Sequence, residues 1–289
     1  MRAGYECNIH FELQKRYYVK GKIVPFERGF HFCNKIENLY AYYNMTDVRI
    51  FEIEANGRII NKDKLYVARK IELVRELTKD EILNYFEENC KNMCHSERPG
   101  VRKAVAEQGL CLDILIHDAD SDVRAAVAGQ GYGLDVLIKD KNACVRAEVA
   151  KQRYGLDKLI KDKDVRVREA VARQGYGLDV LVSDKEYMVR CAVAEQGYGL
   201  DKLISDKEFR VRFAVARKGY GLDRLIEDKN YCVRAAVANQ GYGLEKLIHD
   251  KHKIVRCAVA EQGYGLDELM KDTEECVKIT AIEQLGSLR

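Results

Sequence analysis

Cys90, Cys94, His95 and Cys111 form the one local group of residues whose types match metal ligands. Thiolate sulfur and imidazole nitrogen are the atoms that structural zinc sites use. The Cys-x3-Cys spacing is loose and no second close pair follows it, whereas zinc signatures combine two tight pairs. We therefore predict that this group holds no metal ion.

A histidine and two carboxylates nearer the N-terminus could carry out acid–base chemistry. His31 lies between two phenylalanines, where it could be a general base, a ligand, or a half-buried strand histidine with a satisfied hydrogen bond. The spacing fixes no nucleophile or carboxylate pair near it, which favours the structural role. Glu52 and Glu54 are two residues apart, so a strand would present both on one solvated face. We predict no catalytic residue and no cofactor.

Arginine returns at a fixed period of 22 residues, at Arg102, Arg124, Arg146, Arg168, Arg190, Arg212, Arg234 and Arg256. Such a column could contact phosphate groups, or it could be a structural ladder that links neighbouring repeats. An aspartate stands six residues before most of these arginines, as Asp162 does before Arg168. Because a buried charge needs a partner, this spacing favours the ladder.

A tyrosine column has the same period, at Tyr132, Tyr154, Tyr176, Tyr198, Tyr220, Tyr242 and Tyr264. Evenly spaced aromatic rings could stack on the bases of single-stranded nucleic acid. Most of these tyrosines lie between glycines, which favours a structural turn with the ring packed on the next repeat. Lysine and arginine total 49 against 46 acidic residues, so the chain lacks the basic excess of nucleic-acid-binding proteins. Nucleic-acid binding is the weaker alternative.

These columns lie on helices whose pattern is clear in the unit that begins at Asp162. We expect Asp162 to cap a helix over residues 163–174, Gly175 to end it, and a short helical segment to begin at Leu178. A unit this short cannot bury its own apolar face, so neighbouring units must stack. Residues 91–289 are therefore predicted to form an all-α solenoid, a right-handed superhelix of about eight short helical repeats. The pattern decays past Asp272, as expected of a terminal cap.

Residues 1–90 have a different pattern, which predicts a small α+β domain ahead of the solenoid. β-branched and aromatic residues gather at 17–19, 50–54 and 71–74, as in strands, and Asn56-Gly57 is a turn signal. Residues 35–43 have helical spacing. Thr78 and Glu81 form a capping box ahead of a second helix, which we expect to cover the end of the solenoid.

One repeat departs from the others. Glu148 takes a helix position that alanine holds elsewhere, and Arg153 replaces the glycine that ends the helix. We expect either a pair between Glu148 and Arg153 or Arg166, or a local kink.

Two general properties of the sequence indicate the cellular compartment in which the protein is found. The first twenty residues lack the apolar core of a signal peptide, and no stretch reaches the apolar length of a membrane span. Five of the ten cysteines recur at equivalent repeat positions where other repeats have small or apolar residues. This usage is typical of free thiols in a reducing compartment. We expect a cytoplasmic protein that does not bind membranes.

Function is expected where the repeats differ from one another. On the main helix, residues two before and two after the recurring valine lie ~160° from the core, at 100° per residue. In the central repeats these positions and their borders hold apolar side chains: Tyr187, Met188, Phe209, Phe213, Tyr231 and Ile254. Because aromatic residues and methionine are typical of interface cores, we predict a partner-binding site here. The alternative is that this face packs on the N-terminal domain or on a second copy of the chain.

The repeats resemble leucine-rich-variant repeats and, more broadly, HEAT repeats, although the unit of 22 residues is slightly shorter than either. HEAT repeats carry an Asp and an Arg six residues apart that link neighbours, as Asp184 and Arg190 do in spacing here. The motif Gly-Phe-His-Phe-Cys at 29–33, Tyr-Tyr at 42–43 and the run over 51–57 resemble a small domain of unknown function found in phage and prophage proteins. That resemblance extends over residues 5–82 and implies a phage or prophage origin.

More distantly, the order of elements in residues 1–90 resembles the rifampin ADP-ribosyltransferase layout. Those enzymes open with a Tyr-His-Gly strand that holds the nicotinamide riboside. The matching stretch here is Tyr5-Glu6-Cys7, and the first histidine is His10, so this sequence departs from the family where NAD would bind.

The leading hypothesis is a non-enzymatic protein-binding scaffold, because solenoids bind along extended surfaces and no catalytic constellation is present. Its partner would be another protein, such as a host defence component that it inhibits, or a second copy of the chain. Two alternatives stay open: an ADP-ribosyltransferase-like enzyme head aimed by the solenoid, and a nucleic-acid-binding solenoid.

Overall fold

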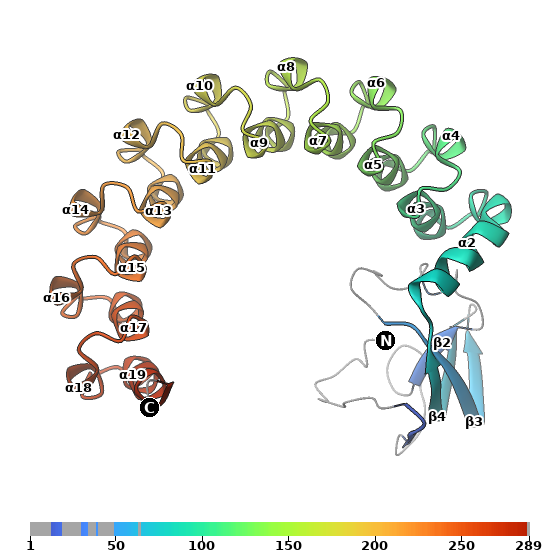
Figure 1. Ribbon diagram of the computed structural model, residues 1–289, viewed down its shortest axis with the longest axis horizontal. Coiled ribbons are helices and arrows are strands. Elements are labelled where there is room, and N and C mark those ends of the chain that lie inside the picture. The colour runs from blue at the N-terminus through green and yellow to red at the C-terminus, as the bar shows by residue number, and fades with distance from the viewer. Residues whose placement is uncertain (1–12, 19–29, 34–38, 40–48, 63–64, 288–289) are drawn as a thin grey trace. The chain divides into compact units, whose positions relative to one another are not determined.

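The computed structural model describes residues 13–18, 30–33, 39, 49–62 and 65–287 (Figure 1). The chain divides into two compact units, Met1–Val145 and Arg146–Arg289. The first unit contains a small antiparallel sheet and the first helical repeats, and the second consists of helical repeats alone. An α+β head and a helical solenoid are therefore both present. Tyr5, Glu6, Cys7, His10 and most of the helix predicted over 35–43 lie outside the described residues.

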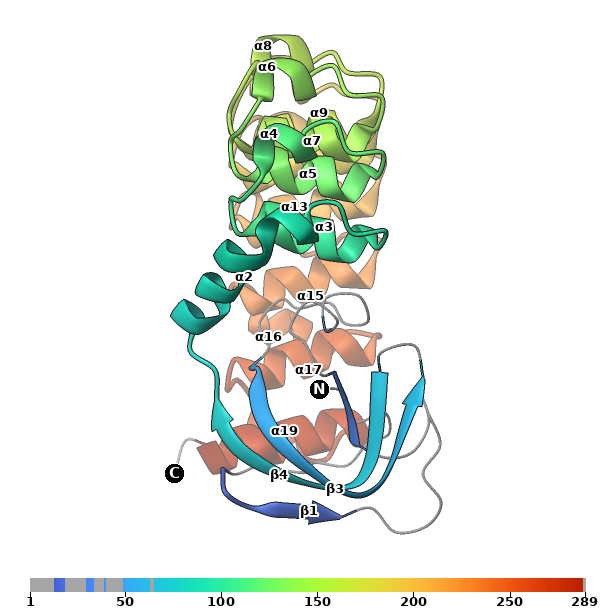
Figure 2. The same ribbon diagram turned by 90° about the vertical axis from the view of Figure 1, so that its right-hand side faces the viewer.

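The head is a four-stranded antiparallel sheet in which β4 pairs with every other strand. Its strands are β1 (Arg16–Tyr18), β2 (Phe30–Cys33), β3 (Phe51–Lys62) and β4 (Leu65–Glu76). β3 pairs along one edge of β4, while β2 and β1 pair one after the other along its second edge (Figure 2). Phe30, Ala68, Ile71 and Leu73 form its buried core.

Asn56-Gly57 does not turn the chain, so this part of the sequence-based prediction is wrong. β3 continues through the pair, and its register against β4 shifts between Asn56 and Ile59. Gly57 has a φ of 84°, a left-handed conformation that glycine adopts without strain. The pair therefore accommodates a β-bulge inside a long strand, a position where glycine is equally favoured.

Helix α2 (Lys79–Met93) joins the head to the first repeat (Figure 2). The Thr78 hydroxyl accepts a hydrogen bond from the Glu81 backbone N–H, and the Glu81 carboxylate accepts one from the Thr78 backbone N–H. This confirms the predicted capping box. Phe86 and Met93 are buried, and α2 packs against the first main helix. α2 therefore covers apolar surface at the end of the repeats, as predicted.

Beyond α2, nine-residue main helices alternate with four-residue short helices. The main helices are α3 (Pro99–Glu107), α5 (Ser121–Gly129), α7 (Ala143–Lys151), α9 (Val165–Arg173), α11 (Tyr187–Glu195), α13 (Phe209–Arg217), α15 (Tyr231–Asn239) and α17 (Lys253–Glu261). The short helices are α4 (Leu112–Leu115), α6 (Leu134–Leu137), α8 (Leu156–Leu159), α10 (Leu178–Leu181), α12 (Leu200–Leu203), α14 (Leu222–Leu225), α16 (Leu244–Leu247) and α18 (Leu266–Leu269). A longer helix, α19 (Glu275–Ser287), follows α18.

In the second unit the main helices pack side by side in one row, and the short helices form a second row beside it (Figure 1). Val167 and Val171 of α9 are fully buried between the rows, and so is Ala172, which lets neighbouring main helices approach closely. Gln174, at the end of the predicted helix, is half-buried. Among the described residues no helix combines the length and apolarity needed to cross a membrane.

The main helix begins later than the sequence suggests. α9 starts at Val165 rather than at residue 163, and its cap is Asp164, whose carboxylate accepts from the Arg166 backbone N–H. Gly177, before the next short helix, has a φ of 59°, and a Cβ atom there would overlap Ile160 of the preceding repeat. Glycine is thus needed for both the backbone conformation and the close stacking of repeats. Asp162, the predicted cap, instead forms an ion pair with Arg146.

Candidate functional site

The arginines of the column are all paired, and six of the eight are buried. Arg190 donates from Nε to Oδ2 of Asp206 at 2.6 Å and from Nη2 to Oδ1 at 2.8 Å, a bidentate contact with the aspartate 16 residues ahead. The side chains of this pair are only 8% and 9% exposed. The same contact recurs in all eight repeats, at Arg102–Asp118, Arg124–Asp140, Arg146–Asp162, Arg168–Asp184, Arg190–Asp206, Arg212–Asp228, Arg234–Asp250 and Arg256–Asp272.

Six of the arginines, Arg124, Arg168, Arg190, Arg212, Arg234 and Arg256, also contact the aspartate six residues before them, although through its backbone carbonyl, and Arg102 contacts the Ser96 carbonyl in the same way. Nη1 of Arg190 donates to the carbonyl oxygen of Asp184 at 2.7 Å and to that of Lys185 at 3.1 Å. One aspartate therefore joins two arginines, one through its carboxylate and the other through its carbonyl. The spacing of six residues marks a carbonyl contact, while the ion pair uses the spacing of sixteen.

The ladder holds its carboxylates in the ionised form. Burial alone would raise the pKa of Asp206, but hydrogen bonds from the Arg190 side chain and from the Glu208 backbone N–H outweigh burial, so its pKa is lowered. The pKa of Asp228 is lowered in the same way by Arg212 and by the Asn230 backbone N–H. Because these guanidinium groups are buried and occupied, they are not free to bind phosphate groups.

The tyrosines of the column are more exposed than expected for rings packed on the next repeat. The seven rings are all between 41% and 43% exposed, at Tyr132, Tyr154, Tyr176, Tyr198, Tyr220, Tyr242 and Tyr264. The backbone is structural: the Tyr176 N–H donates to the Val171 carbonyl at 3.4 Å and closes the end of α9. The column is thus part of the repeat's turn, and its tyrosines are exposed.

The predicted partner-binding residues lie on consecutive main helices of the second unit. We call Tyr187, Met188, Phe209, Phe213 and Tyr231 the main-helix patch; all five are half-buried. Ile254, the sixth predicted residue, is 46% exposed on α17. These positions are neither in the core nor fully in solvent, because neighbouring side chains along the row cover part of each ring.

Three polar side chains that the sequence analysis did not single out complete this surface. The exposed Arg210 guanidinium lies 4.8 Å from the Phe209 ring centroid and 5.4 Å from that of Tyr187. Arg217 lies 6.0 Å from the centroid of Phe213. The His252 ring stacks on Tyr231 with centroids 3.6 Å apart and planes 9° apart. The sequence places Arg210 directly after Phe209, which indicates a contact between them. The second contact of Arg210, with Tyr187, depends on how the main helices pack.

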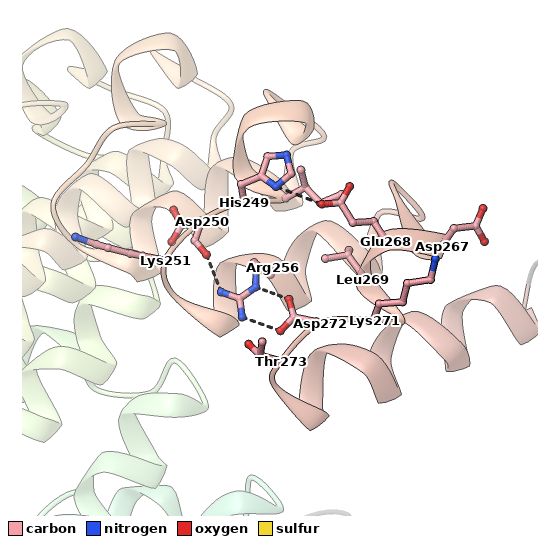
Figure 3. A pocket seen from close by; sticks show the side chains of 11 residues that line it. His249, Asp250, Lys251, Arg256, Asp267, Glu268, Leu269, Lys271, Asp272 and Thr273 are labelled. Atoms are coloured by element: carbon pink, nitrogen blue, oxygen red, sulfur yellow. Dashed lines mark hydrogen bonds and ion pairs between the residues drawn. The ribbon is translucent and has the colours of Figure 1, made fainter.

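A hollow of about 720 Å³ lies beside the last ladder pair, between α16 and α18 (Figure 3). Arg256 and Asp272 line it as a directly bonded ion pair of 2.6 Å, and His249 Nδ1 lies 3.3 Å from a carboxylate oxygen of Glu268 (Figure 3). A similar hollow of about 430 Å³ recurs one repeat earlier, beside Arg234. Because the hollow repeats and its ladder side chains are already paired, we attribute it to the stacking of repeats.

The structure brings the cysteine group together. Burial, and then hydrogen bonds with the thiols of Cys94 and Cys90, raise the pKa of Cys111 to about 12. Cys94 Sγ lies 3.1 Å from Nδ1 of His95. In the part of the chain that the structure describes, no group of three or more potential ligands is arranged to hold a metal ion.

The head's candidate acid–base residues are spread over the sheet. His31 is half-buried on β2 and pairs in register with Val67 of β4. Glu52 and Glu54 are both exposed on β3, and Glu52 forms an ion pair of 2.8 Å with Arg75. The two glutamates thus lie on the exposed face that their spacing predicts.

The irregular repeat keeps its shape. Glu148 forms an ion pair of 2.6 Å with Lys151 one turn ahead. Arg153 adopts a φ of 60° and so takes the left-handed conformation of the glycine it replaces. α7 has nine residues, as the other main helices do.

Comparison with known proteins gives one result for the head. Residues 1–85 match the family described as "Domain of unknown function (DUF7666)". The matched stretch includes the four strands of the sheet and the start of α2, and it is under a third of the 289 residues. No curated protein matches the chain. The match gives the head a family description without an activity.

Proposed function

We propose that this chain is a protein-binding scaffold without enzymatic activity, and that the main-helix patch is its contact surface. One observation carries the proposal: consecutive repeats place half-buried aromatic side chains on one face, with guanidinium groups lying on the rings. Most of the other repeats have small or charged residues at the same positions. In a solenoid the residues that build the scaffold are the same in every repeat, so surface positions that differ between repeats determine which partner binds.

The chemistry of the patch suits protein recognition. Aromatic residues, methionine and arginine are enriched at interface cores and among the residues that contribute most to affinity. The rings of Tyr187 and Phe209 are already held by Arg210, so their ordering on binding costs little entropy. Arg210 and Arg217 add donors that can pair with carboxylates of a partner.

The partner in this proposal is a host protein, such as a defence component that the chain inhibits. This part of the proposal is supported by the resemblance of residues 29–57 to a phage-associated domain.

The test begins by capturing partners from a host lysate on the immobilised full-length protein and identifying them by mass spectrometry. Affinity is then measured by calorimetry with the purified partner. The triple variant Tyr187→Asp, Phe209→Asp and Phe213→Asp should bind at least ~30-fold more weakly, as expected when residues worth about 2 kcal/mol or more are lost. Its circular dichroism should keep the helical signal.

A matched control carries Val180→Asp on short helix α10, where the valine is 57% exposed. This variant should bind with unchanged affinity. Undiminished binding by the triple variant, or an equal loss in the Val180→Asp control, would remove the patch as the contact surface.

A further inference from the structure

Two elements of the first unit bring their thiols together at the start of the repeats. Cys94 ends α2, and Cys111 precedes short helix α4. Cys94 and Cys111 occupy the positions that Ile116 and Gly133 hold one repeat later, where a Cβ atom at 133 would overlap Ile116, and the thiols of Cys94 and Cys90 raise the pKa of Cys111. Cys111 is 17 positions after Cys94 in the sequence, so a bond between them would close a loop around all of α3.

The backbone at Cys111 shows that this cysteine is unusual. Its φ is 53°, in the left-handed region that side-chain-bearing residues avoid. The seven later repeats have glycine at this position, with φ between 59° and 62°. At Gly133, for example, a Cβ atom would overlap Ile116 of the preceding repeat, whereas the residue at 111 faces the cysteines of α2. Strain kept at one such position indicates a role for its side chain.

We propose that Cys94 and Cys111 are a disulfide-forming pair that joins α2 to the first repeat when an organic disulfide such as oxidised glutathione is supplied. The inference is independent of the proposed function. In the reaction, each thiol gives up one proton and one electron, and an Sγ–Sγ bond forms. The S–S bond of the organic disulfide breaks, and its two halves leave as thiols.

The burial of the two thiols determines which of them reacts first. Cys94 is 3% exposed and Cys111 is half-buried, so the organic disulfide reaches Cys111 first. Cys94 then attacks the mixed disulfide, and its proton passes to the glutathione thiolate that leaves. Because the Cys111 pKa is raised to about 12, the first exchange is slow near neutral pH. Incubation for hours at mildly alkaline pH is therefore required.

The test oxidises the full-length protein with oxidised glutathione at pH 8.5, blocks free thiols with iodoacetamide and digests with trypsin. Cleavage separates the three cysteines into peptides 80–91, 92–102 and 104–124. The expected product is a disulfide between peptides 92–102 and 104–124. Closing a loop of this size should raise the unfolding temperature by about 5 °C, and dithiothreitol should reverse the rise.

Variants separate the alternatives. Cys94→Ser and Cys111→Gly should abolish both the linked peptide and the rise, and Cys111→Gly folds because glycine is the residue of the other repeats. Cys90→Ser, and Cys144→Ser at an exposed thiol, should keep both. Three results would overturn the proposal. The first is a disulfide to Cys90, and the second is protein in which Cys144 is glutathionylated while Cys94 and Cys111 remain reduced. The third is one equivalent of bound zinc in the unmodified protein that the Cys111→Gly variant does not bind.

Discussion

Replacing Arg190 with methionine tests whether the ladder holds the repeats together. The substitution keeps much of the aliphatic volume but removes two hydrogen bonds to Asp206 and two to backbone carbonyls. Breaking a buried ion pair at one partner costs about 3–5 kcal/mol, because the remaining charge is left uncompensated. The 9% exposure of the Asp206 side chain gives it little access to water. We therefore expect Arg190→Met to lower the free energy of unfolding by about 4 kcal/mol.

The assay is urea unfolding followed by circular dichroism at 222 nm. With an m-value of about 2 kcal/mol per molar urea, the midpoint should fall by about 2 M. The double variant Arg190→Met/Asp206→Leu removes both charges and should recover most of the loss. Arg217→Met removes an exposed arginine and should change the midpoint little. A loss below about 1 kcal/mol for Arg190→Met, or no recovery in the double variant, refutes this account of the ladder.

Three further outcomes follow from the same geometry. Arg153→Gly removes a left-handed side-chain-bearing residue and should raise the melting temperature by about 2–4 °C in calorimetry; a decrease would show that Arg153 is not strained. Gly221→Ala, which overlaps Ile204, should lower the urea midpoint by more than Gly241→Ala, which meets nothing; equal losses would leave close stacking without support. The lowered pKa values of Asp206 and Asp228 give stability that is present above the unfolded value near 3.9 and lost as pH falls through the folded values. Urea midpoints should therefore fall steeply below about pH 4, and a flat profile would contradict the ladder's electrostatics.

Much of the fold could be predicted from the sequence because repetition averages out local ambiguity. The alternation of main and short helices follows from apolar spacing and from glycines at fixed positions. Helix starts could not be placed as well, because Asp162 and Asp164 are both good caps and only the ion pair with Arg146 decides between them. Asn56-Gly57 fits a turn and a bulge equally, and pairing with β4 selects the bulge.

The candidate site could be predicted only in part. The positions of the patch residues could be predicted because the angle between successive residues of one helix determines which of its side chains face away from the core. The contacts of Arg210 with two rings depend on how neighbouring main helices pack, and a single repeat does not carry that information. The meeting of Cys111 with Cys94 likewise depends on α2 taking the place of a preceding repeat.

The ladder has a consequence for how such a chain can change its length. The carboxylate of Asp206 accepts from Arg190, 16 residues before it, and its carbonyl accepts from Arg212, six residues after it, so the two links together span one repeat. Any two repeats can therefore be made neighbours by unequal recombination in steps of 22 codons, and the same bonds form at the new junction. The scaffold tolerates gain and loss of whole units, whereas the order of aromatic repeats does not survive such an exchange unchanged. Descendants of one gene can thus keep the same architecture while presenting rearranged surfaces.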